Sequence, residues 1–159
     1  MKDTLLLYYS FEGNTQYAAK RLAAHMEMDV ERLVVDKEPP KTGIAKILQG
    51  GKSALRREDP GLHPIRSDIM DYYDIIIAFP VWAGTYPPAI DAFFKAYPFV
   101  GKNVYLVACS GSGNGTKALE KAAERLKGNT VLGTLSLKNP LTYKKEAEAK
   151  IVEFSARRN

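Results

Sequence analysis

Three short runs of the chain are continuously apolar, at residues 5–9, 75–79 and 104–108. Each is too short for a typical helix and rich in large side chains, so each predicts a strand buried on both faces. Two further segments, residues 29–35 and 130–137, mix polar and apolar positions. They predict strands with one exposed face, as at the edges of a sheet.

Between these segments, apolar side chains recur every three or four residues, which is the spacing of one helix face. Helices are predicted to follow the strands from about residues 15, 88, 116 and 143. A fifth, short helix is predicted at residues 44–55, interrupted by Gly50 and Gly51, inside a long connection. Strands that alternate with helices indicate a parallel sheet covered on both faces, with right-handed crossovers.

The hydrophobic pattern also favours one strand order. In the order 2-1-3-4-5 the interior strands are the first, third and fourth, whereas 3-2-1-4-5 buries the second. The three continuously apolar runs are the first, third and fourth strands, so we predict an α/β, three-layer, doubly wound sheet of five parallel strands in the order 2-1-3-4-5. With 159 residues, the chain is expected to form one domain, residues 1–159.

In that order the ligand crevice is expected at the carboxyl ends of the first and third strands. A small polar loop follows the first strand there and passes directly into a helix. Helix starts present unpaired N–H groups, and Ser and Thr add hydroxyl donors, so this junction suits a phosphate group. The alternative is an ordinary strand-to-helix turn with Ser10 or Asn14 as its cap. The loop consists of Ser10, Phe11, Glu12, Gly13, Asn14 and Thr15.

Several other classes of protein fit the residues poorly. A receiver domain needs an Asp at the end of the third strand, where this chain has Ala78, Phe79 and Pro80. The glycine pattern of dinucleotide-binding folds is absent after the first strand, and only a partial match follows the fourth. A single cysteine and two distant histidines argue against a disulfide and a metal site.

The phosphate loop resembles that of the flavodoxin family, usually written [ST]-x-T-G-N-T, and the resemblance extends over essentially the whole chain. It implies FMN as the cofactor and electron transfer as the activity, with no catalytic residue or metal. It also implies that two further loops hold the flavin ring, with the Ala83-Gly84-Thr85 backbone reorienting toward the flavin N5 on reduction. These loops comprise Pro80, Val81, Trp82, Ala83, Gly84 and Thr85, followed by Ser110, Gly111, Ser112, Gly113 and Asn114.

Three features depart from the family pattern. Glu12 replaces a Thr of the phosphate loop, which removes a hydroxyl donor and places a carboxylate near the phosphate. The loop at 110–114 has no aromatic residue to cover the outer face of the ring, so either Tyr86 takes that role or the face is open. The chain is basic, with a pI near 9.2, whereas flavodoxins are typically acidic.

Individual side chains carry further expectations. A lone Trp between Pro and Gly favours a surface platform, so Trp82 is predicted to stack on the flavin rather than to belong to the core. Cys109 is expected to be a buried apolar residue, and Tyr8 and Tyr9 to be core packing. His25 is expected to contact helix-terminal carbonyls or solvent.

Charge and hydropathy limit the kinds of partner that the chain can have. The net charge is +5, of which +4 lies between residues 37 and 66, where seven Lys or Arg stand against three acids. We expect a redox partner protein, an acidic one being favoured by the basic chain, or a small quinone or nicotinamide substrate. The alternative function is an NAD(P)H-dependent flavin or quinone reductase. A nucleic-acid-binding module is disfavoured because aromatic residues do not alternate with the basic ones.

No membrane span or signal peptide is apparent, and a cytoplasmic location is expected.

Overall fold

The computed structural model describes residues 2–39 and 59–158. Its strands are β1 (Lys2–Tyr8), β2 (Asp29–Arg32), β3 (Tyr72–Pro80), β4 (Asn103–Ser110) and β5 (Thr130–Lys138). Its helices are α1 (Asn14–His25), α3 (Pro88–Ala96), α4 (Thr116–Glu124) and α5 (Lys144–Ala156), with a 3-10 turn, η3, at Ile69–Asp71. The predicted helix at residues 44–55 and most of the basic connection lie outside the described residues.

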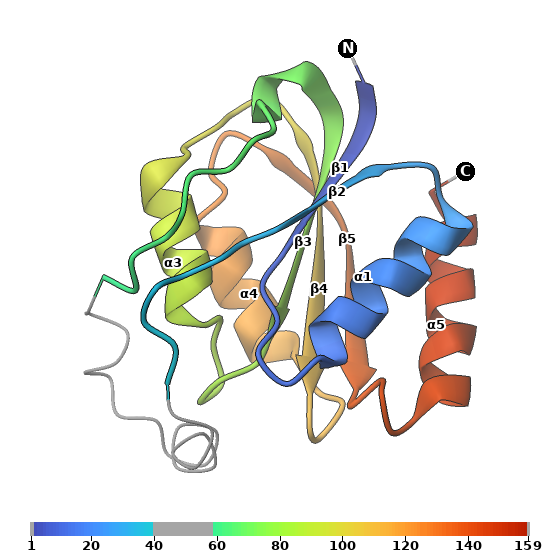
Figure 1. Ribbon diagram of the computed structural model, residues 1–159. Helices are drawn as coiled ribbons and strands as arrows, with labels where there is room; N and C mark the ends of the chain where they lie inside the picture. The colour runs from blue at the N-terminus through green and yellow to red at the C-terminus, as the bar shows by residue number, and fades with distance from the viewer. Residues whose placement is uncertain (1, 40–58, 159) are drawn as a thin grey trace.

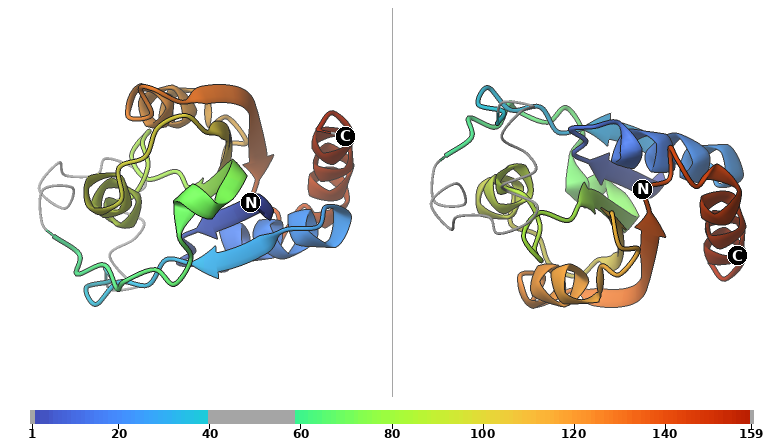
Figure 2. Two further views of the ribbon diagram at one scale, coloured as in Figure 1. Left: turned by 90° about the horizontal axis from the view of Figure 1, so that it is seen from above. Right: turned by 90° about the horizontal axis from the view of Figure 1, so that it is seen from below.

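The five strands form one parallel sheet in the order β2-β1-β3-β4-β5, which confirms the predicted order and fold class. Helices α1 and α5 cover one face of the sheet, and α3 and α4 cover the other (Figures 1 and 2). Side chains of β1 alternate between the two cores. Leu5, Leu7 and Tyr9 pack on the α3 and α4 side, while Leu6 and Tyr8 pack toward α1 and α5. Tyr8 and Tyr9 are therefore core residues, as predicted.

The second strand is shorter than the predicted 29–35, because the chain leaves the regular ladder after Arg32. Leu33 still donates its N–H to the Tyr8 carbonyl at 2.7 Å. Val35 instead pairs in antiparallel fashion with Leu62. The segment that leads into β3 therefore pairs with the residues just after β2, at the edge of the sheet.

His25 is exposed, which is one of the two surroundings expected from the sequence, and it also contacts α5. Its Nε2 lies 2.5 Å from Oε1 of Glu148, and Arg21 donates to both oxygens of the same carboxylate. These bonds, chiefly those from Arg21, lower the pKa of Glu148 to about 2. The cluster joins α1 to α5 across their exposed sides.

No helix within 2–39 or 59–158 has both the length and the apolarity that a membrane crossing requires.

The end of α5 is anchored by a buried arginine. Arg158 Nη2 donates to Asp74 Oδ2 at 2.7 Å and to Thr4 Oγ1 at 3.2 Å, and its guanidinium lies 4.2 Å from the centre of the Tyr105 ring. Its side chain is only 8% exposed. Because Asp74 and Thr4 lie on the neighbouring strands β3 and β1, this one side chain fixes the chain end against the sheet.

Replacing Arg158 by Ala is expected to lower the free energy of unfolding by about 2 to 3 kcal/mol, since it leaves the half-buried Asp74 without its cation. Urea unfolding followed by circular dichroism measures the change. Arg157 is the matched control, because its side chain is 75% exposed and pairs with Glu153 within one helix. Arg157→Ala should cost less than about 0.5 kcal/mol, and equal losses in the two variants would contradict the anchoring role.

Candidate functional site

The loops that follow β1, β3 and β4 meet at the carboxyl end of the sheet, beside the first turn of α1 (Figure 1). They enclose a cleft of about 180 Å³. Ten of the residues predicted from sequence line it, together with two that the prediction missed, Cys109 and Asn139. The lining consists of Ser10, Phe11, Glu12, Asn14, Thr15, Pro80, Val81, Trp82, Cys109, Ser110, Gly111 and Asn139.

The loop after β1 delivers free donors into this cleft. Gly13 occupies the N-cap of α1 with φ of 99°, a conformation that favours glycine, and no side chain within the described residues caps the helix. The hydroxyls of Ser10 and Thr15 are both buried and have no hydrogen-bond partner there. Buried hydroxyls rarely stay unpaired, and the first N–H groups of a helix have no partners within it. The cleft therefore offers a set of unsatisfied donors suited to an anion.

Two contacts hold the loop in this shape. Arg32 Nη2 donates to the Ser10 carbonyl at 3.0 Å from the edge strand β2. Leu141 N donates to Asn14 Oδ1 at 3.0 Å, which ties the loop after β5 to the start of α1. Asn14 therefore accepts from the backbone through its side-chain oxygen, and its amide N–H groups remain as donors at the cleft. Glu12 also lines the cleft, but it is an exposed residue.

The loop after β3 forms a tight turn. Trp82 and Thr85 exchange backbone hydrogen bonds of 2.9 and 3.1 Å, and the residues between them, Ala83 and Gly84, have φ of 51° and 73°. Two successive left-handed residues are the signature of a type I′ turn, which is strained at Ala83 and relaxed at Gly84. Neither of these two residues lines the cleft, so their predicted role at the flavin remains a prediction.

The structure places Trp82 differently from the surface platform expected from sequence. Its side chain is only 6% exposed, and the rings of Tyr9 and Phe11 meet it in edge-on geometry, each with 5.8 Å between centroids. Trp82 thus belongs to the core and also lines the cleft.

Tyr86 points away from the cleft. Its hydroxyl accepts a 3.0 Å hydrogen bond from Arg125 Nη1, which also lies 2.5 Å from Asp91 Oδ1. Its ring packs edge-on against Phe79 and Phe94, with centroid separations of 6.4 and 5.5 Å. Contacts from α3 and the end of α4 therefore keep Tyr86 away from the space above the cleft.

The loop after β4 is stabilised by its own side chains. Ser110 Oγ accepts from Gly113 N, Ser112 Oγ from Asn114 N, and Asn114 Oδ1 from Thr116 N, at 3.0 to 3.1 Å. Only Ser110 and Gly111 of this loop reach the cleft. The others, like Gly13 and Thr85, shape the surrounding backbone without lining the cleft.

The two lining residues missed by the sequence prediction have different characters. Cys109 is buried, as expected for an apolar residue, and burial raises the pKa of its thiol to about 12. The thiol is therefore not a thiolate at neutral pH. Asn139 follows β5 with φ of 28°, and the Asn139-Pro140 pair is the turn signal that could have identified it.

The donor set fits a phosphate better than a metal. Residues 2–39 and 59–158 contain no group of His, Cys, Asp or Glu that could hold an ion. The 180 Å³ cleft is smaller than the roughly 300–1,000 Å³ of sites for whole drug-sized ligands. It can accept the phosphate end of a nucleotide cofactor, with a larger ring lying at its mouth beside Trp82.

Comparisons with solved structures agree with this architecture. A candidate flavoprotein from Bacteroides eggerthii DSM 20697 superposes with a TM-score of 0.71 at 19% identity, over 94% of this chain and 98% of the other. A flavoprotein in complex with FMN from Lactobacillus acidophilus NCFM gives 0.62 at 21% identity, over 91% and 98%. An azoreductase from Bacillus anthracis str. Sterne gives 0.57 at 14% identity, over 99% and 98%.

A search of curated protein sequences found no match. A family model described as flavodoxin matches residues 3–150, a range that includes the three loops of the cleft and all five strands except the first residue of β1. The phosphate loop, the strand order and the position of the cleft all agree with that match. The chain therefore belongs to the flavodoxin family.

Proposed function

We propose that the chain binds FMN at this cleft and passes electrons to a partner. The proposal is carried by the buried hydroxyls of Ser10 and Thr15, which have no hydrogen-bond partner in the described part of the chain, beside the start of α1, which no described side chain caps. A phosphate dianion would satisfy both hydroxyls and the helix N–H groups at once. FMN is the cofactor of the family, and it ends in one phosphate.

The roles of the residues follow from their positions. We assign Ser10, Thr15 and the amide of Asn14 to the phosphate, because all three residues line the cleft. Trp82, which also lines the cleft, is assigned to the ring. FMN itself supplies the electron chemistry, and the protein sets its position and surroundings.

A second function is favoured by Tyr86. Its bond to Arg125 and the small residues at 110–114 leave the outer face of a bound ring open. Hydride transfer needs such a face, because the donor must lie flat on the ring within about 3 to 3.5 Å. The fold is shared with an azoreductase, so an NAD(P)H-dependent reductase of a quinone or related acceptor is the alternative.

The visible spectrum of the purified protein tests the proposal directly, since bound flavin absorbs near 450 nm. Colourless protein that takes up no FMN on addition would refute it. Steady-state oxidation of NADPH with and without a quinone then separates the two functions. A carrier should oxidise little NADPH with or without the quinone. A reductase should oxidise NADPH rapidly once the quinone is added.

Thr15→Ala should weaken FMN binding by about 1.5 to 3 kcal/mol, because a charge-assisted hydrogen bond to the phosphate is lost. Riboflavin, which lacks the phosphate, should bind much more weakly than FMN to the wild type and equally to both proteins. Thr15→Ser keeps the hydroxyl and is the matched control. Fluorescence titration measures the dissociation constants, and an unchanged constant in Thr15→Ala would remove this residue from the site.

Trp82→Ala should weaken FMN binding by about 1 to 3 kcal/mol and brighten the fluorescence of the flavin that stays bound, since an aromatic stack is lost. Trp82→Phe retains a ring and separates the stacking effect from the loss of core packing. Emission spectra at equal flavin occupancy provide the measurement. Strongly fluorescent FMN in the wild type would show that no ring stacks on it.

Tyr86→Leu should change the FMN dissociation constant by less than about twofold, because the side chain stays with Phe79 and Phe94 and leucine keeps that apolar contact. The same titrations as for Trp82 provide the comparison. A loss as large as that in Trp82→Ala would mean that Tyr86 moves onto the ring and covers its outer face.

A further inference from the structure

Four lysines lie at the carboxyl end of the sheet, at the start of α4, the end of β5 and the start of α5, and we call them the cationic rim: Lys117, Lys138, Lys144 and Lys145. Lys117, on the first turn of α4, lies beside the turn after β3, where a Cβ built on Gly84 would be 3.7 Å from its Cδ. Lys138 ends β5 beside the loop after β4, with its Cβ 3.0 Å from a Cβ built on Gly113. Lys144 and Lys145 begin α5.

The rim is not neutralised by the protein. No carboxylate within the described residues forms an ion pair with any of these four lysines, although Lys2, Lys95 and Lys150 are all paired elsewhere. Lys138 and Lys144 lie instead over the rings of Tyr143 and Tyr17, with Nζ 4.6 and 5.8 Å from the ring centres. Glu12 is the acidic residue among those lining the cleft. Among the described residues, four rim lysines without ion-pair partners stand against Glu12, so the rim carries an excess of positive charge.

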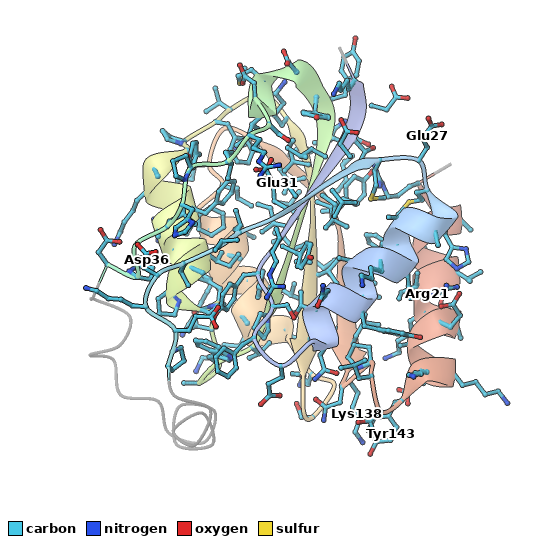
Figure 3. The ribbon with its side chains drawn as sticks, in the orientation of Figure 1. Arg21, Glu27, Glu31, Asp36, Lys138 and Tyr143 are labelled. Atoms are coloured by element: carbon cyan, nitrogen blue, oxygen red, sulfur yellow. The ribbon has the colours of Figure 1, made fainter. Side chains whose placement is uncertain are left out.

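An apolar centre lies within this rim. Leu141 and Tyr143 are each 41% exposed and belong to the loop between β5 and α5. Figure 3 shows Tyr143 and Lys138 side by side below the first turn of α1. Backbone bonds from Thr142 and Tyr143 to the Asn139 carbonyl, at 2.8 and 3.0 Å, fold the loop tightly. The bond from Leu141 N to Asn14 then fixes this loop to the phosphate loop.

Exposed aromatic and aliphatic side chains ringed by like charges have the composition of a docking surface, with an apolar centre and a polar rim. Fixed loops at such a surface need little rearrangement on binding. A rim of one sign also steers an oppositely charged partner and raises its association rate. The charges spread over α4, β5 and α5, which is a wider span than the phosphates of one small molecule need.

We propose that the cationic rim, with Leu141 and Tyr143 at its centre, is the surface on which an acidic electron-transfer protein docks to reach the flavin. This inference rests on the proposed function and names the partner of that same site. It assigns a function to the rim lysines themselves, which lie outside the basic connection between residues 37 and 66.

The experiment measures how charge at the cleft mouth governs oxidation of the reduced FMN protein. The flavin is fully reduced with dithionite, the excess is removed, and two probes are mixed with it by stopped flow. Two ferricyanide ions take one electron each and become ferrocyanide, so the flavin returns to its oxidised form and releases its protons. Hexaamminecobalt(III), a cation of equal and opposite charge, reacts by the same stoichiometry. Each rate is followed from about 10 to about 200 mM ionic strength, a range over which screening becomes strong.

In the wild type, the ferricyanide rate should fall about threefold or more as salt rises, and the hexaamminecobalt(III) rate should increase. The double variant Lys138→Glu with Lys144→Glu should abolish or reverse this fall. Lys20 and Lys127 are exposed and form no ion pair within residues 2–39 and 59–158; Lys20 lies midway along α1 and Lys127 just beyond α4. The double variant Lys20→Glu with Lys127→Glu makes the same change in net charge and should keep the wild-type slope.

Equal shifts in the two double variants would overturn the proposal, because the effect would then come from the charge of the whole molecule. So would a ferricyanide rate that does not respond to salt. The proposal would also be overturned if the KM for NADPH rose severalfold in the Lys138→Glu with Lys144→Glu variant while the salt dependence of the ferricyanide rate stayed unchanged. That result would mean that the rim binds a nucleotide. Wild-type protein that binds no FMN would instead refute the proposed function.

Discussion

The structure depends on the junction of β1 and α1, where the buried hydroxyls of Ser10 and Thr15 have no hydrogen-bond partner within the described residues. The first N–H groups of α1 also have no partners within the helix. Ser10 and Thr15 are each 1% exposed, so water cannot hydrate their hydroxyls freely. Leaving a buried donor unpaired costs about 1 to 3 kcal/mol, which is large against the stability of a small domain. The unpaired hydroxyls of Ser10 and Thr15 therefore lower the stability of the free protein, and a bound phosphate would offset this loss.

The rest of the architecture holds this junction in place. Strand β1 lies between β2 and β3 at the centre of the reversal in strand order, so its carboxyl end faces an open crevice instead of a packed crossover. Arg32 secures the loop from the edge strand, and Leu141 secures it from the loop after β5. The same bond to Asn14 brings the exposed Leu141 and Tyr143 to the cleft mouth. Cofactor site and candidate docking surface therefore share one set of contacts.

The strand order could be predicted because burial on both faces leaves a direct trace, the continuous apolar runs of β1, β3 and β4. The position of the loop at residues 10–15 beside the cleft could be predicted because it follows directly from the strand order. The burial of Trp82 could not, since it depends on rings that Tyr9 and Phe11 bring from another strand end. The position of Tyr86 likewise depends on Arg125, which is distant in sequence. Contacts of this kind have no periodicity or spacing that a single sequence can show.

The most direct test of the account is the phosphorus-31 NMR spectrum of FMN bound to the protein, recorded as a function of pH. Free phosphate monoesters lose their second proton with a pKa of about 6. If the start of α1 and the hydroxyls of Ser10 and Thr15 hold the dianion, its pKa is lowered and the bound resonance should stay constant from about pH 5.5 to about pH 8. A bound resonance that shifts with the pKa of free FMN would show a phosphate exposed to solvent, and would contradict the assignment of this junction as the phosphate site.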